Sequence, residues 1–195
     1  MRLCGLTGGV GMGKSTAAGF FLQQGVRVLD TDDLARQLVQ PGQPALTEIQ
    51  AAFGDEVLTR AGALNRHLLA QRVFASRPER EKLEAILHPR IRQAWMSQVE
   101  QWQEISCSAG VVVIPLLFET QAETHFEQII CVACSAGSQM KRLKARGWSS
   151  EQIAQRIAAQ MPVAEKMSRS HHVIWTEGVL RATERQVEQI VARLR

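Results

Sequence analysis

The amino-acid sequence predicts an α/β protein built on a doubly wound, parallel five-stranded sheet. Five apolar or β-branched runs lack the alternation of half-exposed strands, as expected for strands that are covered on both faces. Segments with helical periodicity separate these runs, and a glycine-rich loop follows the first of them. The five expected strands span residues 2–6, 26–30, 110–118, 128–133 and 171–175.

The glycine-rich loop after the first expected strand is the segment GLTGGVGMGKST. Its residues Gly8, Gly13, Lys14 and Ser15 fill the pattern G-x-x-x-x-G-K-[ST] of a phosphate-binding loop. Glycines let successive backbone N–H groups turn toward an anion, and the following helix adds the positive end of its dipole. We expect Lys14 to reach the β- and γ-phosphates of a purine nucleoside triphosphate and Ser15 to coordinate Mg²⁺. The structural alternative is an ordinary glycine-rich turn.

Aspartates gather at the end of the second expected strand. The chain has only four, and Asp30, Asp32 and Asp33 stand together in VLDTDD. The carboxyl ends of parallel strands share the edge where the phosphate loop lies. Phosphoryl transfer to an alcohol needs a carboxylate that accepts the hydroxyl proton, so we expect Asp32 to be this base. The alternative role is helix capping, which we expect of Asp32 or Asp33 in any case.

About eighty residues separate the second and third expected strands, far more than a crossover needs. Helical periodicity covers residues 41–54, 64–75 and 78–102 of this insertion. The residue before a proline disfavours helix, so His88 before Pro89 predicts a helix break. An insertion at the carboxyl edge of the sheet is placed to bind a second substrate. We therefore expect a mostly helical acceptor domain over residues 36–107.

A shorter helical insertion, residues 138–168, lies between the fourth and fifth expected strands and carries a basic cluster. Arg142 and Arg146 of this cluster are four residues apart, so they share a helix face and are placed to close over a triphosphate as a lid. A solvated basic face is the alternative. The expected architecture is a P-loop NTPase-type fold with an acceptor-binding insertion, a small lid and a nucleotide-binding core of residues 1–35, 108–137 and 169–195.

Composition and charge narrow the class of protein. The chain has 195 residues, 45% of them hydrophobic, which suffices for one domain with insertions. The net charge of +4 permits a nucleic-acid partner, but the basic residues cluster on one helix and the chain has no tyrosine, so we expect no nucleic acid. Neither a leader nor an apolar run of membrane-spanning length is visible, so we expect a cytoplasmic protein without membrane contact. Cys131 and Cys134 are expected to be buried core thiols.

Several classes of protein carry a phosphate loop, and the remaining sequence separates them. A GTPase reads guanine with an N-K-x-D segment, but the single asparagine is Asn65 in LNRHL, and no D-x-x-G follows the loop. A motor or ATPase carries an acidic residue for Mg²⁺ at the end of a strand. The third expected strand instead ends VVVIPLLFE, with Pro115 where an acid might stand. These observations favour a kinase over a switch or a motor.

Several further segments carry a resemblance to one family of kinases. The loop GLTGGVGMGKST and the strand end VLDTD are followed by LNRHLL, LEAILHPRI, IPLLFE and QMKRLKARG. In this combination and order the sequence resembles the dephospho-CoA kinases over nearly its whole length. The resemblance implies transfer of the γ-phosphoryl of ATP to the ribose 3′-hydroxyl of dephospho-CoA, which yields CoA and ADP in the last step of coenzyme A biosynthesis. It also implies that Mg²⁺ accompanies ATP.

The resemblance assigns roles to residues by their position in these motifs. It implies that Asp32 is the catalytic base and that Lys14, Arg142 and Arg146 also take part in catalysis. The residues expected to bind ATP are Gly9, Val10, Gly11, Met12, Gly13, Lys14, Ser15 and Thr16, and Ser15 is expected to be the metal ligand. Dephospho-CoA is expected on Thr7, Asp32, Arg66, His88, Pro115, Leu116, Leu117 and Glu119.

The sequence departs from the family pattern at three positions. Met12 replaces a small serine of the loop, so its side chain must point away from the phosphates. His171 and Thr176 stand where the family shows an aspartate and an asparagine, which bears on the contacts to adenine. Two alternatives remain: a different small-molecule or nucleoside monophosphate kinase on the same scaffold, and a non-catalytic ATP-binding regulatory protein. We expect a monomer or a weak homo-oligomer.

Overall fold

The computed structural model describes residues 1–194 and contains a parallel five-stranded sheet with the strand order β2-β3-β1-β4-β5. All four neighbouring pairs of strands are parallel. The α/β fold with a five-stranded parallel sheet, predicted from the sequence, is confirmed. The strands are β1 (Arg2–Gly8), β2 (Arg27–Asp30), β3 (Ala109–Val113), β4 (Gln128–Ala133) and β5 (His172–Trp175).

The chain divides into two compact units. The first unit holds the sheet and consists of Met1–Asp30 together with the chain from Gln101 onward. The second unit, Thr31–Glu100, is helical. The predicted acceptor domain, 36–107, overlaps this second unit, and the predicted lid, 138–168, belongs to the first. No helix within residues 1–194 has the length and apolar character that crossing a membrane requires.

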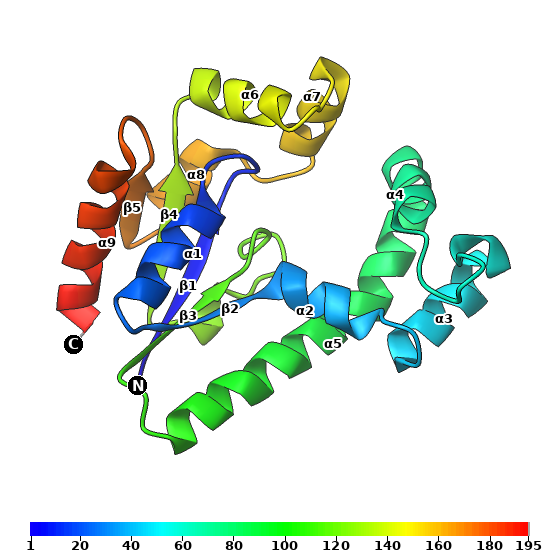
Figure 1. Cartoon of the computed structure of the whole chain (residues 1–195), viewed down its shortest axis with the longest axis horizontal. Coiled ribbons are helices and arrows are strands. Elements are labelled where there is room, and N and C mark those ends of the chain that lie inside the picture. Colours follow the sequence, from blue (N-terminus) through cyan, green and yellow to red (C-terminus); the bar gives the residue numbers. More distant parts are fainter. Residues whose placement is uncertain (195) are drawn as a thin grey trace. The chain divides into compact units, whose positions relative to one another are not determined.

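Two helices cover one face of the sheet in the first unit. Helices α1 (Lys14–Gln23) and α9 (Leu180–Leu194) contact each other and lie side by side (Figure 1). Their apolar side chains form one core with inward-facing residues of four strands. Members of this core include Phe21, Val187, Val191, Leu6, Val111, Ile130 and Ile174.

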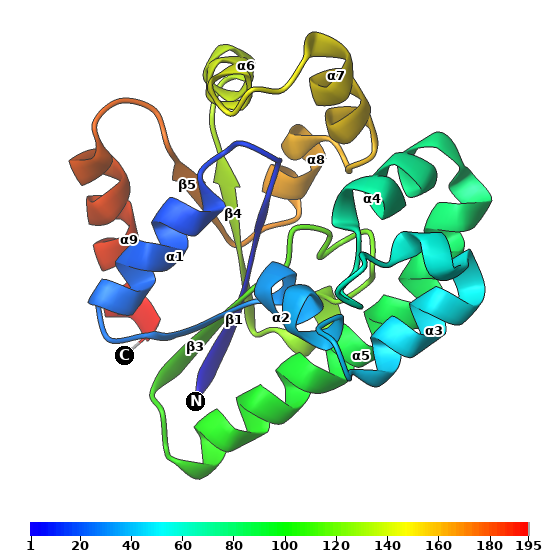
Figure 2. The same ribbon diagram turned by 45° about the vertical axis from the view of Figure 1, so that its right-hand side comes forward.

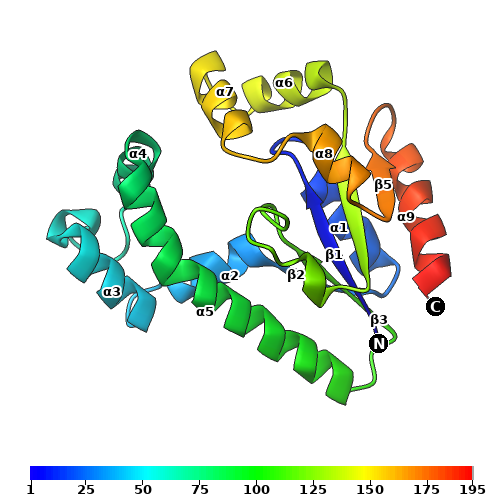
Figure 3. The same cartoon turned by 180° about the vertical axis from the view of Figure 1, so that it is seen from behind.

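The other face of the sheet is covered as well. A Cβ added at Gly5 would lie 2.5 Å from Leu117 Cδ1, and one added at Gly110 would lie 2.7 Å from the Trp102 ring. Helix α8 (Val163–Ser168) contacts β1 and β4 and runs beside them in Figure 3. Because both faces are covered, the strands read as unbroken apolar runs.

Strand β3 is shorter than predicted, because it ends at Val113 and does not continue to residue 118. The backbone N–H of Ile114 still donates to Leu6 O at 2.9 Å. Pro115 has no N–H to add to the ladder, so pairing stops there. The apolar residues that follow form turns, in which the N–H groups of residues 120–122 bond back to carbonyls of residues 116–118.

Three helices fill the segment between β4 and β5. They are α6 (Ala136–Ala145), α7 (Ser150–Ala158) and α8, and Figure 2 shows them following one another beyond the carboxyl end of β4. The side chain of Ser135 accepts the Ser138 N–H at the start of α6. Ser149 and Gln152 form a capping box at the start of α7. These caps satisfy N–H groups that a helix start leaves without an intrahelical partner.

The second unit is built from helices around a core of its own. It contains α2 (Thr31–Leu38), α3 (Pro44–Phe53), a short 3₁₀ helix (Asp55–Val57), α4 (Arg66–Ala75) and most of α5 (Arg77–Glu104). Apolar side chains of α3 and α4 pack with the first half of α5, and the three helices can be followed in Figure 3. This core includes Ile49, Phe53, Val57, Leu69, Val73, Ile86 and Leu87.

The helix break predicted at His88 and Pro89 is wrong, because α5 runs through both residues without interruption. Proline in a helix interior removes one N–H and crowds the carbonyl four residues earlier. The missing Pro89 N–H would have bonded to Ala85 O. The Arg90 guanidinium donates to the neighbouring Ile86 O at 2.7 Å and does not replace that bond. The long apolar packing of α5 outweighs the local preference of a single residue.

Candidate active site

The phosphate loop joins β1 to α1 in a conformation that only glycine adopts easily. Gly8 has φ 144°, and a Cβ there would stand 2.1 Å from Val132 O. Gly13 is the N-cap of α1 with φ 98°, and no side chain caps this terminus. The first N–H groups of α1 are therefore available to an anion in the loop.

Lys14 and two hydroxyl residues stand at the start of α1. The Lys14 ammonium donates to Gly8 O at 2.9 Å and to Gly9 O at 3.1 Å, which places its charge across the loop. Ser15 and Thr16 are exposed in the first turn of the helix. A hydroxyl oxygen is a suitable ligand for Mg²⁺, and the uncapped helix end with a lysine suits phosphate. These residues fit a magnesium-bound triphosphate.

Met12, which departs from the family pattern, is 2% exposed. Its side chain packs in an apolar cluster with Ala133, Cys134 and Met167. A flexible thioether fills such a gap well. The loop therefore presents its backbone to a ligand, while the methionine side chain joins the protein interior.

Thr176 connects the loop with the expected lid arginine. Its hydroxyl donates to Met12 O at 2.8 Å and accepts a hydrogen bond from Arg142 Nη1 at 2.8 Å. Arg142 Nη2 also donates to Thr176 O. Arg146, four residues further on, is the C-cap of α6 and is exposed.

Glu177 is an acidic residue next to this arginine, at the base of the lid. Its two carboxylate oxygens accept hydrogen bonds from Ser135 N at 2.7 Å and from Ser138 Oγ at 2.8 Å. The hydrogen bond from Ser135, followed by that from Ser138 and by the charge of Arg142, lowers the pKa of the Glu177 carboxyl. The start of α6 is thus tied to the segment that follows β5.

The two family departures near β5 lie at opposite ends of the strand. Thr176 follows the carboxyl end, where its hydroxyl contacts the phosphate loop. His171 precedes the amino end, where its Nδ1 accepts the Ile129 N–H at 3.0 Å. An aspartate would accept the same bond with a carboxylate oxygen. Of the two residues, Thr176 is therefore the one that contacts the phosphate loop.

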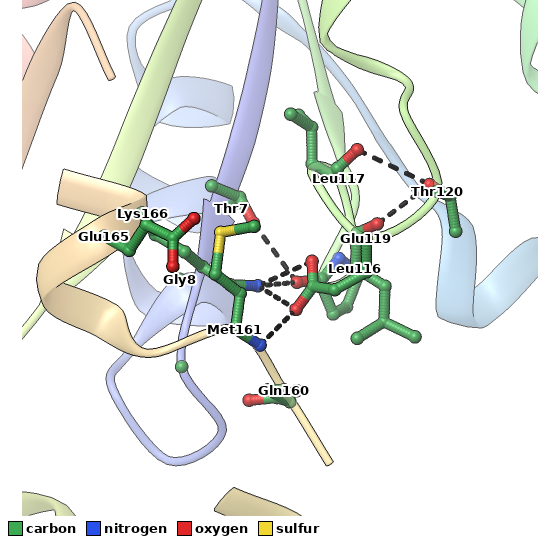
Figure 4. Close-up of polar contacts among 12 residues, drawn as sticks. Thr7, Gly8, Leu116, Leu117, Glu119, Thr120, Gln160, Met161, Glu165 and Lys166 are labelled. Carbon is green, nitrogen blue, oxygen red and sulfur yellow. Dashed lines mark hydrogen bonds and ion pairs between the residues drawn. The ribbon is translucent and has the colours of Figure 1, made fainter. Parts of the chain in front are cut away.

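The segment after β3 carries four of the residues expected to bind the acceptor. Pro115 O accepts the Thr7 hydroxyl at 3.2 Å and the Lys166 ammonium at 2.7 Å. The carboxylate of Glu119 pairs with Lys166 at 2.8 Å and accepts the Met161 N–H at 2.8 Å (Figure 4). The Leu117 side chain is fully buried, whereas Leu116 is partly exposed.

Cys131 and Cys134 are buried, as expected of core thiols. Burial raises the pKa of the Cys131 thiol to about 11, against the opposing charges of Lys166 and Lys14. Burial likewise raises the pKa of Cys134. Two lysine ammonium groups therefore act on the carboxyl end of β4, and one of them, Lys166, belongs to no motif singled out from the sequence.

Asp32 and Asp33 lie in the first turn of α2, in the second unit. The helix begins at Thr31, so neither aspartate occupies the N-cap position and the capping role expected for one of them is wrong. Carboxylates in a first turn still stabilise a helix through its dipole. Asp33 pairs with Arg36 at 2.7 Å on an exposed surface. Asp32 is exposed and follows the last residue of β2 by two positions in the chain.

The other two acceptor residues of the second unit are Arg66 and His88. Arg66 begins α4 and donates to Arg36 O at 3.2 Å, which connects α4 to α2. His88 lines a cavity of about 510 Å³ along α5, together with Arg92 and Met96. Arg66 is not among the residues that line this cavity, so the structure does not bring Arg66 and His88 together there.

Sequence reasoning missed four polar side chains around the phosphate loop. Gln160, Lys166 and Glu177 belong to none of the motifs quoted above, and Gln139 begins QMKRLKARG but received no role. Each acts on a backbone group or a side chain far away in the sequence. One weak signal existed, since Lys166 interrupts an apolar stripe in the short segment VAEKMS. Helical periodicity by itself predicts that such a lysine lies on the solvent-exposed face of its helix.

A parallel sheet of this order, with a phosphate loop after β1 and a helical insertion before β5, defines the protein as a P-loop kinase by fold and site. The family model of dephospho-CoA kinase matches residues 2–181. The chain belongs to the dephospho-CoA kinase family.

Individual relatives extend this match over the full chain. A dephospho-CoA kinase of Syntrophotalea carbinolica is 40% identical over 195 residues, which cover 100% of this chain and 92% of that protein. A dephospho-CoA kinase of Acinetobacter baylyi is 43% identical over 188 residues, covering 96% and 95%. The crystal structure of TT1252 from Thermus thermophilus has a TM-score of 0.85 at 32% identity and covers 100% of this chain and 98% of that one. These matches favour a kinase over a non-catalytic regulatory protein.

Proposed function

We propose that this member of the dephospho-CoA kinase family transfers the γ-phosphoryl of ATP to the ribose 3′-hydroxyl of dephospho-CoA, with Asp32 as the general base. The observation that carries the proposal is the phosphate loop. Its glycine backbone, the Lys14 charge and the uncapped start of α1 together suit the β- and γ-phosphates of a nucleotide.

ATP is held by residues 9–16 of the loop, through backbone N–H groups other than that of Val10, which donates to Gln160 Oε1, and through the Lys14 ammonium. Support comes from its contacts with Gly8 O and Gly9 O, which hold the Lys14 charge at the loop. Ser15 would hold Mg²⁺, because its hydroxyl is exposed in the first turn of α1. Magnesium, when bound, neutralises charge on the β- and γ-oxygens.

The oxygen of the ribose 3′-hydroxyl attacks the γ-phosphorus, and Asp32 accepts the proton that this hydroxyl loses. The bond between the γ-phosphorus and the β–γ bridging oxygen breaks, which releases ADP. Support comes from the chain itself, because Asp32 follows the carboxyl end of β2 by two residues. It also comes from the pairing of Asp33 with Arg36, which leaves Asp33 a separate, local role.

Arg142 and Arg146 supply positive charge to the transferring phosphoryl group when the lid closes. A positive charge that stabilises the transition state more than the bound substrate lowers the activation barrier, whereas one that stabilises both equally does not. The hydrogen bonds of Arg142 to Thr176 hold this arginine beside the loop, and Arg146 is exposed one helical turn away.

Dephospho-CoA contacts the second unit through Arg66 and His88, and the first unit through Thr7 and the segment Pro115–Glu119. The cavity beside His88 along α5 supports this part of the proposal. The enzyme works as a monomer or weak homo-oligomer in the cytoplasm, where ATP is plentiful.

The assignment is tested by ADP release from ATP and Mg²⁺ with a panel of acceptors. Dephospho-CoA should stimulate release strongly, and the product should be CoA by mass. Stimulation by a nucleoside monophosphate instead of dephospho-CoA would assign a different kinase. Tight ATP binding without any acceptor-dependent ADP would indicate a regulatory protein.

The role of Asp32 is tested with Asp32→Asn and the matched control Asp33→Asn. Asp32→Asn should bind ATP as the parent does but lower kcat about 10²-fold or more, the scale of a lost general base. Asp33→Asn loses only an exposed ion pair and should retain kcat. An unchanged kcat in Asp32→Asn would move the base to another residue.

A further inference from the structure

A short segment that joins α7 to α8 and includes the first four residues of α8, the strap Gln160–Lys166, contacts both the phosphate loop and the segment that follows β3. At its first residue, Gln160 Oε1 accepts the Val10 N–H at 2.9 Å. At its last residue, the Lys166 ammonium donates to Pro115 O at 2.7 Å and pairs with Glu119 at 2.8 Å. Figure 4 shows Met161 and Lys166 in contact with Glu119, and Gln160 next to Met161.

Lys166 is a fully buried cation, with 0% of its side chain exposed. Taking the Lys166 ammonium out of water costs several kcal/mol. Its partner Glu119 keeps 22% of its side chain exposed, so the pair is not fully shielded from water and offsets this cost only in part. Stability alone therefore explains the buried Lys166 poorly. The pair does, however, fix geometry, because the buried ammonium tolerates few positions of the carboxylate.

Glu119 holds the strap at two points. Besides Lys166, its carboxylate accepts the Met161 N–H at 2.8 Å, one residue from Gln160. Glu119 is itself placed by a turn, in which the Thr120 hydroxyl donates to Leu116 O at 2.8 Å. The position of the Gln160 backbone is thus set by the rigid segment after β3.

Gln160 acts on the third residue of the phosphate loop. Val10 has both backbone groups held by side chains from the lid region, because Gln139 Nε2 donates to Val10 O at 2.8 Å while Gln160 accepts its N–H. Gln139 is 6% exposed, so this contact is shielded from water. The two amides together fix the direction of the peptides around Val10, and hence which loop N–H groups face a phosphate.

We propose that the strap is a positioning element for the kinase reaction. The Lys166–Glu119 pair holds Gln160 in place, and Gln160 holds Val10, so that the phosphate loop has its ATP-binding shape before ATP arrives. Lys166 and Gln160 are positioning residues that act through the loop backbone. The inference rests on the proposed role of the loop as the ATP site.

The test compares three variants with the parent: Lys166→Met/Glu119→Met, Gln160→Ala, and the triple combination. The double variant preserves net charge, so the loss of a cation near the triphosphate does not confound the result. Calorimetry without acceptor gives the Kd for ATP·Mg²⁺, steady-state kinetics gives kcat and both KM values, and thermal unfolding gives Tm. Arg2→Met/Glu127→Met is the matched control, because it removes an ion pair at the amino end of β1 and leaves the strap intact.

The double variant and Gln160→Ala should each weaken ATP binding about tenfold, the effect of one lost positioning hydrogen bond. The triple variant should bind ATP no more weakly than either of the other two, because the effects of residues that act through one contact are not additive. The Tm of the double variant should stay near the parent value. The KM of Gln160→Ala for dephospho-CoA should also stay near the parent value, because Gln160 is not among the residues proposed to bind the acceptor. The control pair should bind ATP like the parent.

Parent-like ATP affinity in the double variant or in Gln160→Ala would overturn the proposal, as would losses that multiply in the triple variant. A double variant whose ATP affinity falls only in proportion to a lower Tm would assign the pair a purely structural role and also overturn it. Failure of the kinase assignment appears separately, as a parent protein that binds ATP but releases no ADP with dephospho-CoA.

Discussion

Replacing Thr176 by valine tests how the carboxyl end of β5 supports the phosphate loop. Valine has nearly the same shape but no hydroxyl. The change removes the donor to Met12 O and one of the two acceptors of Arg142, both at 2.8 Å. Thr176 is 6% exposed, so water does not readily replace these bonds. Thr176→Ser is the matched control, because it retains the oxygen and loses only a methyl group.

The expected loss of stability follows from these two contacts. A buried carbonyl without a donor costs about 1 kcal/mol or more, and one bond of a partly buried arginine adds about 1 kcal/mol. A chain of this size loses about 2–4 °C in Tm per kcal/mol, so Thr176→Val should melt about 4–8 °C below the parent.

Calorimetric unfolding of parent, valine and serine variants measures this effect, and ATP titration measures its functional consequence. Thr176→Val should also weaken ATP binding, because the loop carbonyl and the lid arginine both lose a fixed partner. Thr176→Ser should retain most of both properties. The reasoning is refuted if valine and parent melt together, or if serine loses as much stability as valine.

Three further predictions concern the loop, the lid and the thiols. Gly8→Ala should yield little folded protein and no ATP binding, because its Cβ would stand 2.1 Å from Val132 O; normal expression with parent-like affinity would contradict the geometry. Arg146→Ala should lower kcat about tenfold or more with Tm unchanged, since the residue is exposed, and a loss of ATP affinity alone would make it a binding residue only. At neutral pH a disulfide-exchange reagent should react quickly with Cys107 alone and with the three buried thiols only after denaturation, so rapid reaction of more than one thiol would refute their burial.

Local patterns in the sequence predicted the fold class and the phosphate loop. A strand buried on both faces needs an unbroken apolar run, and the loop needs glycines at Gly8 and Gly13 because their φ values are positive. Both requirements concern residues close together in the chain, so they can be recognised in the sequence. The kinase class followed in the same way, from motifs whose chemistry constrains each residue type.

The predictions from sequence were wrong at two positions where two structural preferences conflicted. The apolar run after Val113 suggested a longer strand, but Pro115 stops the ladder and the chain turns. Pro89 suggested a helix break, but α5 runs through it, with Ile86 and Leu87 of the preceding turn packed against the core of the second unit. Such conflicts are decided by the sum of tertiary contacts, which no window of sequence contains.

The sequence by itself determined the sheet, the loop and the membership of a kinase class, because each depends on periodicity or on spacing within a few residues. Only the tertiary structure decided how the loop is held. Gln160 reaches Val10 across 150 residues of chain, and Lys166 reaches Pro115 across 51. A glutamine or a lysine in a helical segment looks solvent-exposed in sequence. Its role appears only when folding brings a distant backbone group within hydrogen-bond distance.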